Sequence, residues 1–96
     1  MSEQQKKSHK LEIQIDDETS QGVYINLAAV NHSESEFVID FIFAQPQLPK
    51  AKVRSRVITS PQHVKRLIAT LHENLQRYES RFGAIKTEQP PGNQMN

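Results

Sequence analysis

Apolar and polar positions alternate along four short segments of the chain, and this alternation predicts four β-strands. Side chains that recur at every second position line one face of a pleated strand. The strongest example is segment 36–44, where Phe37, Ile39, Phe41 and Phe43 fall on one face. The four predicted strands are residues 11–15, 23–30, 36–44 and 51–58.

Polar and proline-containing connections separate these segments. Residues 16–22 and 31–35 are polar and turn-prone, as the loops between strands usually are. Pro46 and Pro49 exclude 45–49 from a central strand, because each proline would remove a hydrogen-bond donor from the ladder. The short connections favour an antiparallel meander, in which each strand pairs with the next one along the chain.

The last two predicted strands have a register that can be deduced from their connection. A turn centred on Gln47 places Asp40 opposite Arg54 and Phe41 opposite Val53. This register aligns an acid with a base and an apolar side chain with another, as cross-strand pairs prefer.

A long amphipathic helix is predicted after the strands, over residues 61–82. Ser60 can cap its first turn, Pro61 suits the first helical position, and Gly83 suits the C-terminal cap. The fold class is therefore α+β: a four-stranded antiparallel meander followed by one long C-terminal amphipathic helix. The apolar side of the helix carries Val64, Leu67, Ile68, Leu71, Leu75, Tyr78 and Phe82.

One helix is too narrow to cover a four-stranded sheet. Four strands span about 19 Å at about 4.8 Å each, whereas a helix is about 10 Å across. Exposed apolar surface on this scale usually marks an interface, so we expect a homo-oligomer, most simply a two-fold dimer. The candidate oligomer or partner surface lies on the other side of the sheet from the phenylalanines and comprises Tyr24, Val30, Val38 and Ile42.

Composition limits the chain to one small domain. The 96 residues carry a formal net charge of +1. They include no cysteine, and this excludes a disulfide scaffold and thiolate chemistry. No apolar run approaches the ~20 residues needed to span a bilayer, so a cytoplasmic location is expected. We predict disordered tails at 1–9 and 85–96 around a domain at 10–84, because 1–8 and 87–96 lack apolar residues to bury.

The residues that could carry chemistry do not converge. His63 and His72 are nine positions apart and lie on opposite sides of the predicted helix, so they cannot share a metal ion. Glu36 and Asp40 point the same way on one strand but are about 13 Å apart, too far for a two-carboxylate hydrolytic site. We therefore expect no enzyme activity, no metal site and no cofactor.

A basic stripe is the one distinctive charge pattern. Lys50, Lys52, Arg54 and Arg56 alternate along the fourth predicted strand and would all project from one face. One interpretation is a solubilised or protected edge strand, because charges on edges discourage aggregation. The other is contact with an anionic partner, either nucleic acid or an acidic protein.

Several strings carry a family resemblance: GVYINL at 22–27, NHS at 31–33 with EFVIDF at 36–41, PKAKVRSRVI at 49–58, and SPQHVKRL at 60–67. In this order and spacing they resemble the family of short bacterial proteins catalogued as domain of unknown function 3467, over about residues 11–83. The resemblance implies a free-standing cytoplasmic bacterial protein and brings no activity, cofactor or catalytic residue.

The predicted element order is also similar to that of the SecB-type export chaperones, which assemble through sheets and helices and bind unfolded chains on apolar grooves. The chain lacks the acidic balance of that family. Two hypotheses follow. The first is a homo-oligomeric protein-binding module, chaperone-like in character. The second is a nucleic-acid-associated accessory protein that uses the basic stripe.

Overall fold

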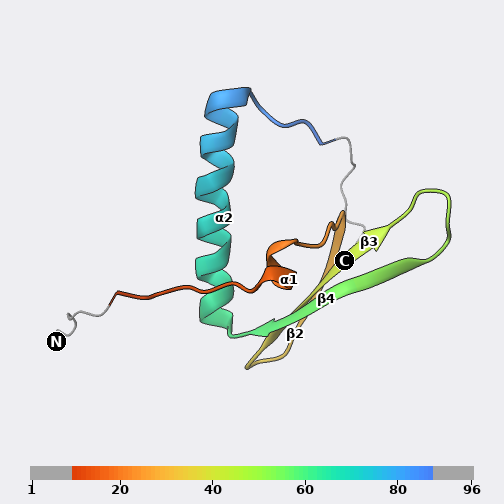
Figure 1. Cartoon of the computed structure of the whole chain (residues 1–96), viewed down its shortest axis with the longest axis horizontal. Coiled ribbons are helices and arrows are strands. Elements are labelled where there is room, and N and C mark those ends of the chain that lie inside the picture. Colours follow the sequence, from red (N-terminus) through yellow and green to blue (C-terminus); the bar gives the residue numbers. More distant parts are fainter. Residues whose placement is uncertain (1–9, 88–96) are drawn as a thin grey trace.

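Three strands and two helices follow one another in the computed structural model, which describes residues 10–87. Figure 1 shows a twisted antiparallel sheet with the long helix standing beside it. The elements in chain order are α1 (Asp17–Ser20), β2 (Leu27–His32), β3 (Phe37–Ala44), β4 (Ala51–Thr59) and α2 (Pro61–Phe82). The predicted tail at 1–9 lies outside the described residues, as do residues 88–96 of the predicted tail at 85–96, whereas the structure describes Ile85–Thr87 as coil.

The sheet has the strand order β2-β3-β4, with both neighbouring pairs antiparallel. The predicted meander is therefore confirmed for these three strands. β3 is the central strand and has a neighbour on each edge. It is also the most apolar of the three, as suits a strand with neighbours on both sides. It also carries the two buried residues of the described chain, Ile39 and Asp40.

The first of the four predicted strands, residues 11–15, is not part of this sheet. Residues 11–15 are coil rather than ladder-paired strand, and Leu11, Ile13 and Ile15 are 85%, 83% and 65% exposed. The segment extends away from the sheet (Figure 1). The loop after it contains α1, whose N-cap Asp16 accepts a hydrogen bond from the Thr19 amide at 2.8 Å.

β2 begins at Leu27, four residues later than predicted, because Asn26 closes its ladder with a side chain. The Asn26 amide nitrogen donates to the Ala44 carbonyl at 2.9 Å, and its carbonyl oxygen accepts from the Ala44 amide at 2.9 Å. These two bonds take the place of the next backbone pair of the sheet. At the other end β2 runs past the predicted Val30 to His32, whose ring stacks on Phe37 with 5.2 Å between centroids.

The predicted register between β3 and β4 was wrong by two residues at Asp40, which pairs with Arg56 rather than Arg54. Ala44 pairs with Ala51, so the connecting loop centres between Gln47 and Leu48 and accounts for one residue of the shift. A bulge between Phe41 and Ile42 accounts for the other. Phe41 pairs with Ser55 whereas Ile42 pairs with Val53, which leaves Arg54 as the extra residue. Phe41 therefore does not oppose Val53 as expected.

The helix prediction is confirmed at both ends of α2. The Ser60 hydroxyl oxygen accepts from the His63 amide at 3.1 Å, and Pro61 occupies the start of the helix. Gly83 ends it at a φ of 99°, a conformation that favours glycine. Only Ser60 separates β4 from α2, and it is extended at φ −83° and ψ 158°. The helix therefore leaves the sheet at an angle set by this two-residue joint, Ser60–Pro61.

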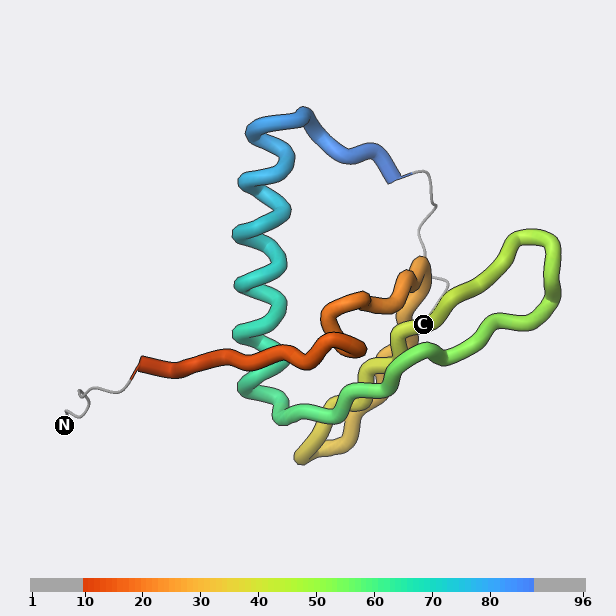
Figure 2. Tube along the Cα trace, in the orientation of Figure 1, coloured from red at the N-terminus to blue at the C-terminus, as the bar shows by residue number. Residues whose placement is uncertain are grey.

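The helix and sheet form an open arrangement with little shared core. Figure 2 shows α2 rising from the end of β4 while the sheet extends to one side. The radius of gyration is 17.3 Å, against about 12.5 Å for a compact domain of 96 residues. None of the 22 residues of α2, all of them described, is buried. Ile39 is the only buried apolar residue in the described part of the chain.

Candidate interaction surfaces

The apolar side of α2 is a continuous stripe of exposed apolar side chains. Only its first turns are shielded, since Val64 and Leu67 are half-buried near the sheet. Beyond them the side chains are open. The exposed fractions are 61% for Ile68, 61% for Leu71, 44% for Leu75, 49% for Tyr78 and 67% for Phe82. The Tyr78 and Phe82 rings contact each other, with centroids 4.9 Å apart.

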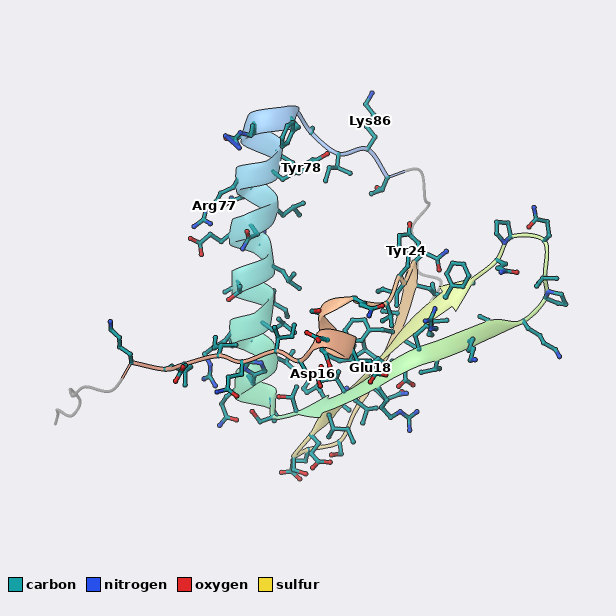
Figure 3. The ribbon with its side chains drawn as sticks, viewed as in Figure 1. Asp16, Glu18, Tyr24, Arg77, Tyr78 and Lys86 are labelled. Atoms are coloured by element: carbon teal, nitrogen blue, oxygen red, sulfur yellow. The ribbon has the colours of Figure 1, made fainter. Side chains whose placement is uncertain are left out.

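The opposite side of α2 is polar and carries its own ion pair. Arg77 donates to a Glu73 carboxylate oxygen at 2.8 Å, an exposed pair one helical turn apart. Arg77 and Tyr78 point to opposite sides of the helix, with Tyr78 on the side toward the sheet (Figure 3). The helix therefore has one face suited to water and one that the described chain leaves without a cover.

The two faces of the sheet divide the residues of the predicted partner surface. The phenylalanine face is the side of β3 that carries Phe37, Ile39, Phe41 and Phe43, and the Asp40 face is the other side. Val30 pairs with Ile39 and so lies on the phenylalanine face, whereas Val38 and Ile42 lie on the Asp40 face. Tyr24 contacts Phe43 edge-on, with 6.1 Å between centroids. The four residues therefore do not form one surface.

An ion pair occupies the centre of the Asp40 face. The Arg56 guanidinium donates to both carboxylate oxygens of Asp40, at 2.7 and 2.9 Å. These hydrogen bonds hold the pKa of the Asp40 carboxyl below its ordinary value despite desolvation, and they raise the pKa of Arg56. Asp40 is buried while the Arg56 side chain is 62% exposed, so the arginine lies over the carboxylate and shields it.

The bulge separates the basic residues that the sequence pattern places on one face. Lys52 pairs with Phe43 and lies on the phenylalanine face, whereas Arg56 lies on the Asp40 face. Arg54 lines a shallow cavity of about 510 Å³ together with Ser55 and Glu18 of α1, which places it on the phenylalanine side. The prediction that all four basic side chains share a face is therefore wrong, and Arg56 is committed to Asp40.

Lys50 and Lys52 converge at the end of the β3–β4 hairpin, around an apolar cavity. Its volume is about 440 Å³, and its lining comprises Phe43, Gln45, Leu48, Lys50, Ala51 and Lys52. Leu48 is 54% exposed, and a hydrogen bond from its amide to the Gln45 carbonyl at 3.1 Å fixes the turn. Two cations thus flank an apolar floor that is open to solvent.

Comparison with known proteins identifies the family. The family described as "Protein of unknown function (DUF3467)" matches residues 1–87, which include every described element. The chain belongs to the DUF3467 family. No curated protein and no solved structure matches it.

The three histidines of this DUF3467 chain that the structure describes lie on β2 and α2. The His63 amide is engaged in the cap of α2, and His32 stacks on Phe37 at the far end of β2. Within residues 10–87 the structure brings no three potential metal ligands together. His9 lies outside the described residues. Neither helix in the described chain is both long and apolar enough to cross a membrane.

Two features of the DUF3467 surface were missed from the sequence. Asn26 was assigned to the interior of a strand, because a single asparagine carries no signal that distinguishes a ladder-closing side chain. The convergence of Lys50 and Lys52 with Phe43 on one face was also missed, because it depends on a loop that centres between Gln47 and Leu48 instead of on Gln47. Nothing in the spacing of the basic residues indicates that shift.

Proposed function

We propose that this DUF3467 chain is a homo-oligomeric protein-binding module, chaperone-like in presenting open apolar surface, and that it is not an enzyme. The observation that carries the proposal is that none of the residues of α2 is buried although one side of it is continuously apolar. An uncovered stripe of this kind is typical of an interface rather than of a stable monomer surface.

Stability favours assembly. A folded domain must offset the conformational entropy of ordering its residues mainly by apolar burial. Here Ile39 alone among the described apolar residues is buried, so one copy gains little from burial. A second copy that covers α2 would add the missing burial, and folded stability would then depend on protomer concentration.

The hairpin end is the proposed site for a protein partner. Its cavity offers an apolar floor at Phe43 and Leu48 with Lys50 and Lys52 at the rim. This chemistry suits an extended segment that presents one apolar side chain beside carboxylates, because the apolar group would fill the cavity while the lysines attract the acids. The site lies away from α2 at the far end of the hairpin (Figure 1), so assembly through the helix leaves it accessible.

The test has two arms on the full chain. Light scattering coupled to size exclusion should give a mass above one protomer that falls on dilution.

Fluorescence anisotropy should detect binding of a labelled acidic peptide containing one leucine, and of a permanently unfolded model polypeptide. Leu48→Ser should weaken peptide binding by tenfold or more, since burying a leucine contributes about 1.5–3 kcal/mol. Gln47→Ser, in the same turn but outside the cavity lining, is the matched control. A dilution-independent monomer that binds neither probe would refute the proposal.

Nucleic-acid binding is the second candidate, favoured by the exposed Tyr24 ring on Phe43 beside Lys52. Single-strand binders combine basic side chains with aromatic stacking platforms. If Lys50, Lys52 and Arg54 each neutralised one phosphate of a single strand, log K against log salt would slope at about −2. A labelled oligonucleotide titrated at several salt concentrations separates the candidates. A slope near zero, or no binding, would exclude nucleic-acid binding and leave protein binding as the remaining candidate.

A further inference from the structure

The apolar stripe of α2 repeats with the spacing of a coiled-coil seam. Ile68, Leu75 and Phe82 are seven residues apart, and Val64, Leu71 and Tyr78 form a second series offset by three or four. Alternating steps of three and four residues give the 3.5-residue period of two helices that pack along each other. A helix that covers a sheet has similar spacing over a few turns, so the choice of a second helix rests on the flanking charges and on the exposure of the stripe.

We propose that α2 packs antiparallel against α2 of a second copy, with the two-fold axis level with Glu73. This deepens the proposed oligomer by naming its interface, and it rests on that proposal. In this register Leu71 lies opposite Leu75 of the second copy, and Ile68 lies opposite Tyr78 of the second copy. Each contact occurs twice, as a two-fold interface requires.

The charges that flank the seam select the antiparallel direction. Lys65, His72 and Glu79 follow one edge of the stripe at seven-residue spacing. In the antiparallel arrangement equivalent edges face each other, so Lys65 of one copy lies beside Glu79 of the other, twice per dimer. In a parallel arrangement opposite edges meet, which sets Glu79 beside Asn74 and forms no ion pair.

Lys65 and Glu79 cannot pair with each other within one chain. Lys65 and Glu79 are 14 residues apart on one helix, which is about 21 Å. Glu79 accepts a hydrogen bond from the Ile85 amide at 2.9 Å, which holds its side chain near the end of the helix. On the polar side, Glu73 and Arg77 already satisfy each other, so that side is suited to solvent.

The stripe is large enough for a specific contact. Taking a large side chain as about 200 Å², the exposed fractions of Ile68, Leu71, Leu75, Tyr78 and Phe82 amount to about 560 Å² per copy. A standard protein interface buries about 800 Å² per partner, and the flanking polar residues supply the remainder. The antiparallel register also brings Phe82 of each copy beside Val64 of the other copy. Val64 lies at the end of its helix that is nearest its own sheet.

A charge-swap cycle tests the register. Lys65→Glu and Glu79→Lys should each weaken dimerisation about tenfold at low ionic strength, which corresponds to about 1.4 kcal/mol. The double variant should return to within about threefold of the unmodified chain, since it re-forms the pair with reversed charges. Loss of the Glu79–Ile85 hydrogen bond cancels in the coupling energy from this cycle, because it occurs both in Glu79→Lys alone and in the double variant. Sedimentation equilibrium of the full chain gives the dissociation constants.

Cross-linking tests the direction independently, because the chain contains no cysteine. Asn74→Cys should couple to itself across the two-fold axis with a short bismaleimide. Arg81→Cys lies on the same edge one heptad later, and its counterpart is displaced by about 24 Å along the axis, so it should not couple. Equal yields at both positions would indicate parallel helices. A dimer with equal yields, or without recovery in the double variant, would overturn this pairing and leave the oligomer intact. A monomer at all concentrations would overturn both.

Discussion

The side chain of Asn26 acts as a strand-closing clamp, and its removal gives the most direct test of the fold. Asn26→Ala deletes both hydrogen bonds to the Ala44 backbone, each 2.9 Å long. A neutral hydrogen bond contributes a net ~0.5–1.5 kcal/mol. Because Asn26 is exposed, water can replace part of the loss, so we expect the free energy of unfolding to fall by about 1–2 kcal/mol.

Thermal unfolding followed by circular dichroism measures this loss. For a domain of this size the melting temperature should fall by roughly 5–10 °C, at a fixed protein concentration since assembly affects it. Asn26→Asp should lose at least as much, because a carboxylate oxygen would then face the Ala44 carbonyl in place of a donor. Asn31→Ala is the matched control. Asn31 lies on the same strand, and its side chain makes no hydrogen bond to any described residue.

Hydrogen exchange locates the effect. The Ala44 amide should exchange faster in Asn26→Ala than in the unmodified chain, while amides at the Phe37 end of β3 should change only by the global loss of stability. Unchanged exchange at Ala44, together with a melting temperature within 1–2 °C of the control, would show that the clamp contributes nothing and would refute this reasoning.

Two further predictions concern the centre of β3. Ile39→Ala should destabilise the chain by about 2–5 kcal/mol and Ile39→Val by about 0.5–1.5 kcal/mol, measured by urea denaturation; equal effects would contradict a packed site. The Asp40 pKa lies below its ordinary value, so the stability it contributes is complete above the unfolded pKa and is lost as pH falls through the folded one. Arg56→Met should flatten this acid dependence in urea titrations at pH 2–6, and an unchanged profile would rule out Arg56 as its cause.

Helix α2 was predictable because its signals are local. Ser60, Pro61 and Gly83 lie at its ends, and seven apolar residues recur at helical spacing between them. The three strands of the sheet were predictable for the same reason, since period-two alternation depends only on neighbouring residues. Segment 11–15 has that alternation too, but it pairs with no strand of the described sheet, because alternation does not encode which strands pair.

The pairing of β3 with β4 was less predictable because it depends on features that alternation does not encode. A six-residue loop and one bulge shifted the partner of Asp40 by two positions. An even shift preserves which side each residue faces, so Asp40 still meets a basic partner. The loop by itself is an odd shift, and it moved Lys52 to the phenylalanine face; the bulge adds a second odd shift, which keeps Arg56 on the Asp40 face. The surface of the sheet was therefore less predictable than its strands.

The Ser60–Pro61 joint has a consequence for how the chain meets other molecules. Proline fixes its own φ and confines the preceding residue to extended conformations, so this joint narrows the directions in which α2 can leave β4 before any tertiary contact forms. The helix is thus partly preorganised by covalent geometry. A preorganised surface loses less conformational freedom on association, so orienting the helix costs less free energy when another molecule binds.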